Sequence, residues 1–498
     1  MKEILSVENM RKSDAATIAG GIPGKELMYR AGKGIFENVE WKAPVAIVAG
    51  SGNNAGDGYV IAKLLHDKGM ECSIILLKEK FSEDGKYYYD ICCEAGIKTE
   101  IWNENTELSG YNTIADCIFG TGFKGDVSGT AKEVIEKINA AKAYVVSVDI
   151  NSGLNGDNGL AECCVVSDLT VSIGSLQPGH FLNMAKDVIG KKINIDIGIE
   201  PADKPFMLIE EADISGLFSP RKNYSNKGTY GYTALIGGSE RYSGAIRLAA
   251  MSDAAMRSGA GVVKLAAPKS LEGVILPAIL ESTFFPLSEN DGQAAFSETE
   301  IGELISNVKT AAFGMGIGTG EGAEEILKYL LMNYKGKLIV DADGLTLLSR
   351  IDKETVQKRS CKLILTPHIK EFSRLTGKEI NEILVAPVET AAAYAKENGL
   401  ILLLKGPSTI VTDGEQVLIT DAGCAGMATA GSGDVLSGIL AAVCAYSEDL
   451  LRATAAAAYI NGKAGEEAQK QKGSISMTAG DTVANIPAVI KTMELSQE

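Results

Sequence analysis

Histidine, paired cysteine and long apolar runs are all scarce in this chain of 498 residues. It holds three histidines and nine cysteines, with no C-x-x-C pair or histidine-rich tract that would indicate a zinc site. The cysteines are scattered apart from the neighbours Cys92–Cys93 and Cys163–Cys164, so we expect buried apolar thiols rather than disulfides. Because no run of 18 uncharged apolar residues and no signal sequence occur, we expect a soluble, cytoplasmic protein.

Positive charge is in deficit as well. The chain has 48 Lys and Arg against 64 Asp and Glu, a net charge of −16. Such a chain lacks the field that attracts nucleic acid or an anionic membrane, so we expect neither partner. Any anionic ligand must be bound by local groups. We therefore expect small molecules as partners. We also expect a homo-oligomer.

The length predicts two domains, since one ordinary core does not grow to this size. Both halves alternate helical segments with short apolar strands, which predicts the α/β class with a parallel sheet in each half. A proline-containing stretch separates them, and we place the boundary between domains 1–212 and 213–498 there. The expected strands of the first half and the first strand of the second are 45–49, 72–77, 113–118, 144–148, 169–173 and 232–236.

Polar strand ends predict a pocket in the first half. The glycine- and asparagine-rich segment Gly50–Gly58 follows a strand and opens a helix expected over 59–68, a context that suits phosphate binding. Its Asn and Asp oxygens equally suit a cation, a ribose or a nicotinamide, and a plain Asn-Gly turn is the alternative. Segments 115–125 and 148–154 also end strands in Asp, Asn, Ser and Gly. Three such strand ends at one sheet edge define a pocket.

The segment Gly423–Asp434 carries the strongest signal of the second half. Its small residues precede an apolar helix expected over 435–443, and a helix N-terminus with free N–H groups suits an anion. Phosphate would repel Asp434, so we expect this carboxylate to serve a substrate hydroxyl or a metal ion. The combination predicts phosphoryl chemistry on a small molecule. A glycine-rich helix cap with a solvated aspartate is the alternative.

Further strand ends of the second half carry Gly, Asp and Lys, as an open α/β sheet does at its ligand crevice. Strands are expected at 362–365 and 402–404, and a strand ends at Val340. They are followed by 366–372, 405–409 and the carboxylate-bearing 341–344, while the glycine-rich 314–320 opens another helix.

Residues 1 to about 210 resemble the NAD(P)H-hydrate epimerase family through segments 50–58, 115–125 and 148–154, with Ala55 where the family carries glycine. The resemblance implies a Rossmann-like α/β/α sandwich and a potassium ion held by Asn54, Asp116 and Ser152. It implies proton transfer by Asp149 beside the nicotinamide C6. The substrate-binding residues that it implies are Asn53, Asn54, Ala55, Gly56, Asp57, Gly120, Thr121, Gly122, Phe123, Lys124, Gly125, Asp126 and Asp149.

For Asp116 a purely structural role is the alternative, in which backbone N–H groups of the Gly120–Gly122 loop donate to its carboxylate.

Residues from about 220 to 495 resemble the ribokinase-like family of ADP- or ATP-dependent NAD(P)H-hydrate dehydratases. The matching segments, in the family's order, are 237–245, 257–261, 314–320, 366–368, 405–406 and 426–434. The resemblance implies that Asp434 takes a hydroxyl proton, that Gly431–Gly433 stabilises the moving phosphoryl group, and that Mg²⁺ neutralises the nucleotide phosphates. Implied contacts are Ala245, Gly318, His368 and Asp434 for the hydrate, and Lys405, Gly406, Pro407, Ser408, Thr409 and Gly433 for ADP or ATP.

Together the two resemblances imply repair of hydrated nicotinamide cofactors. The first domain would interconvert the R and S epimers at C6, and the second would dehydrate the S epimer, with ADP converted to AMP and phosphate. A small-molecule kinase with a nucleotide-binding N-terminal domain is the alternative, because the ribokinase-like fold hosts many kinases. A nonenzymatic binding protein is a third reading, against which the retained Asp57, Asp149 and Asp434 argue.

Overall fold

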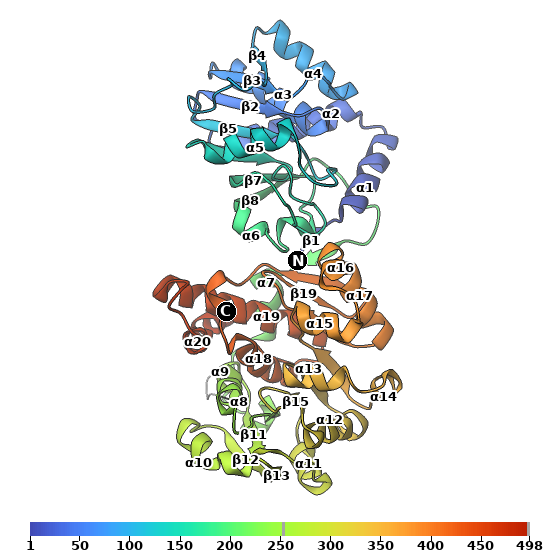
Figure 1. The fold of residues 1–498 in the computed structure, drawn as a ribbon, viewed down its shortest axis with the longest axis vertical. Helices are drawn as coiled ribbons and strands as arrows, with labels where there is room; N and C mark the ends of the chain where they lie inside the picture. Colours follow the sequence, from blue (N-terminus) through green and yellow to red (C-terminus); the bar gives the residue numbers. More distant parts are fainter. Residues whose placement is uncertain (251–253, 496–498) are drawn as a thin grey trace. The chain divides into compact units, whose positions relative to one another are not determined.

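A computed structural model describes residues 1–250 and 254–495 (Figure 1). They form two compact units, Glu3–Phe206 and the chain from Met207 onward with Met1–Lys2. Each unit is an α/β fold built on a largely parallel sheet, as predicted. Within the described ranges, no helix has the length and apolar character needed to cross a bilayer.

The first unit is a parallel sheet of seven strands in the order β4-β3-β2-β5-β6-β7-β8. The chain runs outward from β2 in one direction and from β5 in the other, so the strand order reverses between these two strands. Ligands bind at such a switch point, beyond the carboxyl ends of the strands. The strands are β2 Val45–Ala49, β3 Cys72–Leu76, β4 Lys98–Ile101, β5 Thr113–Cys117, β6 Tyr144–Val148, β7 Ser167–Ile173 and β8 Ile189–Ile195.

Helices flank this sheet (Figure 1). They are α1 Val7–Ala19, α2 Gly24–Asn38, α3 Asn53–Asp67, α4 Glu83–Glu94, α5 Thr130–Ala140 and α6 Ala185–Val188. The predicted helix start at residue 59 is wrong, because α3 already begins at Asn53. The strand-to-helix turn is therefore only Gly50–Gly52, and a Cβ at Gly50 would lie 2.0 Å from the Ile118 carbonyl oxygen. Packing of the next turns against the sheet overrides the low helix propensity of Asn and Gly.

The second unit is a longer sheet, whose strands from β9 onward follow the order β9-β20-β19-β18-β17-β16-β15-β10-β11-β12. The seven strands from β18 to β12 in this order run parallel, namely β18, β17, β16, β15, β10, β11 and β12. Strands β18, β19 and β20 form an antiparallel meander. The strands are β9 Phe206–Leu208, β10 Tyr232–Ile236, β11 Val262–Pro268, β12 Thr283–Leu287, β15 Thr310–Phe313, β16 Lys337–Val340, β17 Lys362–Leu365, β18 Ile401–Leu404, β19 Thr409–Thr412 and β20 Val417–Thr420.

The helices of the second unit that position its site are α8 Ser243–Ala250, α9 Ala254–Arg257, α12 Glu321–Asn333, α13 Asp343–Leu348, α15 Ile369–Thr376, α18 Ser432–Tyr446, α19 Leu450–Lys472 and α20 Ala479–Leu495. Helix α18 is the central one: every residue from Val435 to Ala445 is buried, as expected of a helix that is apolar on all sides. Its N-cap is Gly431, whose φ of +92° is a left-handed conformation that suits glycine.

The cysteines are free thiols, and six of the nine are buried, as expected from the sequence. Cys93 is exposed, and Cys163 and Cys424 are partly exposed.

Candidate active sites

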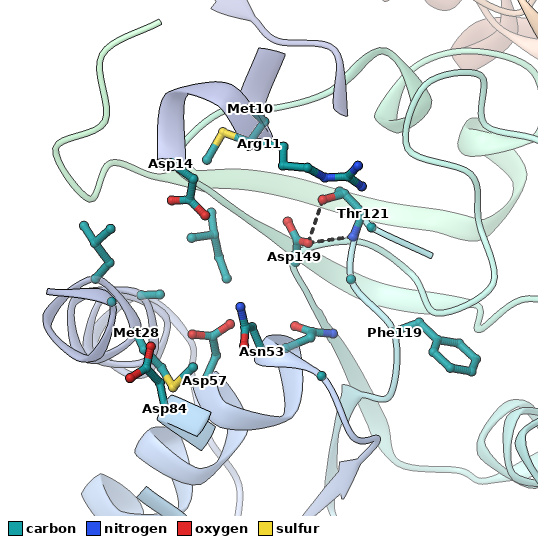
Figure 2. Close-up of a pocket in the computed structure, with 18 of the residues that line it drawn as sticks. Met10, Arg11, Asp14, Met28, Asn53, Asp57, Asp84, Phe119, Thr121 and Asp149 are labelled. Atoms are coloured by element: carbon teal, nitrogen blue, oxygen red, sulfur yellow. Dashed lines mark hydrogen bonds between the residues drawn. The ribbon is translucent and has the colours of Figure 1, made fainter. Parts of the chain in front are cut away.

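A cavity of about 530 Å³ lies at the switch point of the first unit (Figure 2). It is bounded by α1, α2, the start of α3 and the loops after β5 and β6. Of the residues predicted there, the lining includes Asn53, Asn54, Asp57, Gly120, Thr121, Gly122, Phe123 and Asp149. Ala55 and Gly56 turn instead toward the core and Met28, and Lys124, Gly125 and Asp126 lie on the exposed outer part of their loop.

Asp149 is held firmly in this cavity. Its Oδ2 accepts hydrogen bonds from the backbone N–H of Thr121 at 2.7 Å and from the Thr121 hydroxyl at 3.1 Å. Its φ is +68°, a conformation that costs an L-residue about 1–3 kcal/mol unless the surroundings impose it. The ring of His180 helps to impose it, since Nδ1 accepts from the Gln177 N–H and Nε2 then donates to the Asp149 carbonyl oxygen at 2.9 Å. Burial lowers the pKa of His180 to about 4, so this ring is neutral near pH 7.

Burial raises the pKa of two aspartates in this cavity. Burial raises the pKa of Asp149 to about 6, although the hydrogen bonds from Thr121 oppose the rise. Burial, with the negative charges of Asp149 and Asp14, raises the pKa of Asp57 well above its ordinary value. Near pH 7 Asp149 is therefore mostly ionised, whereas Asp57 is shifted toward its protonated form. Such a pair offers a base and an acid in one pocket.

The three predicted potassium ligands differ in their hydrogen bonds. Asp116 is fully buried and accepts from the Ile118 N–H, from the Ser147 hydroxyl, and from both the N–H and the hydroxyl of Ser152. The Gly120–Gly122 loop does not supply these bonds, since its Thr121 donates to Asp149. Asn54 differs, because its buried side-chain oxygen and nitrogen have no hydrogen-bond partner in the described structure. A buried amide without partners is costly, so this site calls for a ligand.

Sequence reasoning missed the wall that α1 contributes. Met10, Arg11 and Asp14 line the cavity from this helix, and Asp84 lines it from α4 (Figure 2). Among the described lining residues Arg11 is the single cation, against four aspartates. The spacing of Met10 and Asp14, one helical turn apart, was the available signal.

The second unit gathers charged groups at the carboxyl ends of β16, β17 and β18. The Nζ of Lys405 lies 2.8 Å from Asp341 Oδ1 and 3.9 Å from Glu371 Oε2. The second oxygen of Asp341 accepts from the Ser437 hydroxyl at 2.9 Å, and Asp341 is buried. Burial lowers the pKa of Lys405, but Asp341 and Glu371 outweigh it and the pKa is raised.

Asp434 stands in the first turn of α18 beside this pair. A Cβ on the neighbouring Gly433 would lie 3.4 Å from Lys405 Nζ and 3.5 Å from Asp341 Oδ2. Burial, followed by the charge of Asp341, raises the pKa of Asp434 to about 7, while Lys405 opposes the rise. Asp434 therefore exchanges a proton in the neutral range, as a general base must. The structure thus brings three predicted residues, Lys405, Gly433 and Asp434, to one place.

The predicted substrate contacts lie around the same strand ends. His368 caps α15, with Nδ1 accepting from the N–H groups of Lys370 and Glu371, and its Nε2 lies 3.4 Å from Glu371 Oε1. Burial and Lys405 lower the pKa of His368. The Gly318 N–H donates to Asp343 Oδ2 at 2.9 Å.

The remaining predicted contacts lie on two further segments. Ala245, on α8, packs 3.0 Å from where a Cβ on Gly316 would stand. Gly406 and Pro407 form the turn between β18 and β19, and Thr409 begins β19. In that turn the Ser408 hydroxyl donates to Asp421.

Sequence reasoning gave no role to Asp341, Glu371 or Ser437. Asp341 was visible as a carboxylate at a strand end, which is a usual position for a functional acid. Ser437 was visible as the polar residue within the apolar run 435–443.

The fold and both sites define a two-domain α/β enzyme, with a Rossmann-like first unit and a ribokinase-like second unit. A family model described as NAD(P)H-hydrate dehydratase matches residues 233–488, and one described as YjeF-related protein N-terminus matches residues 24–179. The chain belongs to the family of bifunctional NAD(P)H-hydrate repair enzymes.

Relatives of this name match nearly the whole chain. The one from Moorella thermoacetica is 34% identical, over 95% of this chain and 93% of its own length. The one from Archaeoglobus fulgidus is 33% identical over 98% of both chains. Among solved structures, the ADP/ATP-dependent NAD(P)H-hydrate dehydratase of Bacillus subtilis, co-crystallised with ATP and Mg²⁺, is 28% identical with a TM-score of 0.50. It covers 58% of this chain and 99% of its own.

Proposed function

We propose that this chain repairs hydrated NADH and NADPH in the cytoplasm by two reactions at two separate sites. The first unit interconverts the R and S epimers at C6, and the second unit dehydrates the S epimer at the expense of ADP, or of ATP. The observation that carries the proposal is a positioned carboxyl group in each site: Asp149, held by Thr121, and Asp434, in the first turn of α18 beside the Lys405–Asp341 pair. Burial raises their pKa values to about 6 and about 7, which suits a base. The matches to both halves of a repair enzyme support this function over a small-molecule kinase.

Epimerisation of a C6 hydroxyl next to the ring nitrogen requires a base and an acid. In the proposed reaction Asp149 accepts the proton of the C6 hydroxyl, the C6–N1 bond opens to leave an aldehyde at C6, and Asp57 donates its proton to N1. Rotation about the bond that carries the aldehyde, followed by the reverse steps, closes the ring on the other face. A pKa of about 6 suits Asp149 as the base, and the raised pKa of Asp57 favours the protonated form that an acid needs.

A potassium ion fits the unpartnered amide of Asn54. Oxygen donors select hard cations, and one carboxylate among neutral donors suits a monovalent ion. We propose that Asn54, Asp116 and Ser152 hold this ion, which fixes the start of α3 and the loop after β5 beside the substrate. Potassium is expected to raise wild-type epimerisation or thermal stability, and Asp116→Ala should lose that response. A wild-type protein that is indifferent to potassium over sodium would contradict the site.

Dehydration needs hydroxide converted into a better leaving group. In the proposed reaction Asp434 accepts the proton of the C6 hydroxyl while its oxygen attacks the terminal phosphoryl group of ADP, which releases AMP. Phosphate then leaves C6 and a proton leaves C5, which restores the ring double bond. The N–H groups of Gly431–Gly433 would stabilise the transferring phosphoryl group, and Lys405, whose Nζ lies next to Gly433, would stand beside it. The hydrate would be held by Ala245, Gly318 and His368, and the nucleotide by 405–409.

Magnesium suits this second site only together with the nucleotide. The described residues hold no group of three or more His, Cys, Asp or Glu that could bind a metal ion alone. Mg²⁺ in such enzymes is bound by phosphates, water and one or two carboxylates, and Asp343 and Glu371 supply carboxylates near Asp434 and Lys405. The ion would neutralise charge on the phosphates.

Absorbance at 340 nm tests the whole proposal, because only the repaired cofactor absorbs there. A mixture of R and S hydrates with ADP and Mg²⁺ should be converted completely by the wild-type protein. Asp149→Asn should convert the S share quickly and the rest only at the uncatalysed rate of epimerisation. Omission of nucleotide should give no recovery. Recovery without nucleotide, or phosphorylation of a sugar or hydroxymethylpyrimidine at a comparable rate, would contradict it.

We also propose that the two units fold independently. The sequence-based boundary after residue 212 leaves β9 with the first fragment, yet β9 pairs with β20 of the second unit's sheet. A division before Phe206 should therefore give two soluble fragments, each with its own activity, whereas fragments soluble only together would contradict the proposal. A homo-oligomer stays a prediction, which light scattering on the purified chain can test.

A further inference from the structure

The second unit contains another cavity, of about 590 Å³, which the proposed chemistry does not use. It lies between α9, the C-terminal end of α18 and α20, three helices that contact one another (Figure 1). The segment that leads into β10 closes it through Arg221 and Tyr230. Tyr446, the last residue of α18, lines it, whereas Asp434 stands in the first turn of that helix. A helix rises 1.5 Å per residue, so the two sites are about 18 Å apart.

The cavity combines apolar surface with positive charge. Tyr446 and Pro487 contribute apolar lining, and Arg221, Arg257 and Lys491 contribute three cations against one carboxylate, that of Glu494. This local excess stands out in a chain of net charge −16. A local cluster of cations attracts an anion even where the whole chain repels it.

Two of the lining groups are already fixed in place. The guanidinium of Arg221 stacks 4.2 Å from the centre of the Tyr230 ring and donates to the Gly259 carbonyl oxygen at 2.9 Å. The Tyr446 hydroxyl donates to the Ser258 carbonyl oxygen at 3.2 Å. Pro487 cannot donate a backbone hydrogen bond inside α20, which leaves the helix ladder interrupted where it borders the cavity. Preorganised rings and charges of this kind lower the cost of binding a ligand.

We infer that this cavity binds a small aromatic phosphate of the size of a nucleoside monophosphate. Its volume falls in the range of ligand pockets, its rings offer a surface for stacking a base, and its three cations complement a phosphate dianion. AMP, which the proposed dehydration releases, has this chemistry. The product of the reaction would then bind at the end of α18 opposite to Asp434.

Equilibrium dialysis of the full chain with labelled AMP tests the inference. Wild type should bind one more AMP per chain than Lys491→Glu, or bind that AMP at least about tenfold more tightly, about 1.4 kcal/mol. Lys491 is exposed, so the variant should fold, and equal dehydration rates at saturating ADP would verify this. The matched control Lys472→Glu makes the same charge change at an exposed position at the end of α19 and should bind AMP as the wild type does.

Ribose 5-phosphate separates recognition of the ring from recognition of the phosphate alone. Ribose 5-phosphate lacks the aromatic base. It should therefore fail to displace the additional AMP that the wild type binds and Lys491→Glu does not. Displacement at equal concentration would overturn the aromatic part of the assignment. Identical AMP stoichiometry and affinity in wild type and Lys491→Glu would overturn the site itself, while the dehydration assay on the same samples reports separately on the proposed function.

Discussion

The first cavity gathers several carboxyl groups around a single cation, whereas in the second site Lys405 pairs with Asp341 and lies 3.9 Å from Glu371. In the first cavity four aspartates share one arginine, and the pKa values of Asp14, Asp57 and Asp149 are all raised by burial. In the second site Lys405 and Ser437 together occupy both oxygens of Asp341. Uncompensated acids hold protons near neutral pH and suit proton transfer, while a paired lysine and aspartate form a fixed frame for phosphate. In the second site burial raises the pKa of Glu371 as well, and that of Asp434, next to that frame, to about 7.

The largest expected effect separates the two sites by activity. Asp434→Asn should lower dehydration by about 10²- to 10⁴-fold, the usual contribution of a general base, and leave epimerisation unchanged. Asp149→Asn should lower epimerisation and leave dehydration of the S epimer unchanged. Recovery at 340 nm measures dehydration of the pure S epimer, and chromatography of the two epimers without nucleotide measures epimerisation. Loss of both activities in either variant would mean that the sites are not independent.

A smaller effect on stability tests the difference in charge compensation. Lys405→Met leaves the buried Asp341 without its cation and should lower the free energy of unfolding by about 3 kcal/mol. Asp57→Asn should instead raise the free energy of unfolding at pH 8, because burial of the Asp57 carboxyl raises its pKa and therefore costs stability above its ordinary pKa. The pKa of Asp57 is raised in the folded state, so this gain should shrink as the pH falls toward 4. Urea unfolding at pH 5 and pH 8 measures the free energy of unfolding of both variants. A change of the same sign in the two variants at pH 8 would contradict the difference in charge compensation between the two sites.

The smallest expected effect is a difference in pH dependence. Each base must be ionised, so kcat/KM should rise with pH and reach half its plateau near pH 6 for epimerisation and near pH 7 for dehydration. Asp341→Asn removes a negative charge that raises the pKa of Asp434, so it should shift only the dehydration profile to lower pH. Coincident profiles in the wild type, or a shift in both activities, would argue against the assignment of these two bases.

The sequence predicted the central strands well and the sheet edges poorly. Runs such as Val45–Ala49 and Tyr144–Val148 are apolar and buried, and their bounds match the structure. Strand β4 was missed because Lys98 and Glu100 interrupt any apolar pattern, as is common at a sheet edge. The start of α3 was misplaced because tertiary packing, not local propensity, forms its first turn.

Within the sites, sequence motifs identified individual residues at strand ends. Which of these residues contact one another could be learned only from the fold. Lys405 follows β18 and Asp341 follows β16, and β17 lies between these strands, so no spacing in the sequence announces their pairing. The α1 wall depends on long-range bonds of Asn9 and Ser13 to residues 202–203. Contacts of that kind are set by the packed structure alone.

The left-handed backbone of Asp149 bears on how this protein can be engineered. Asparagine and glycine adopt a φ of +68° more readily than aspartate does, so either replacement relieves strain and also removes a buried acid. A library screened for heat resistance alone would therefore enrich changes at this position, and its most robust survivors would be poor epimerases. Any thermostabilisation of this chain has to screen turnover of the R epimer alongside melting temperature.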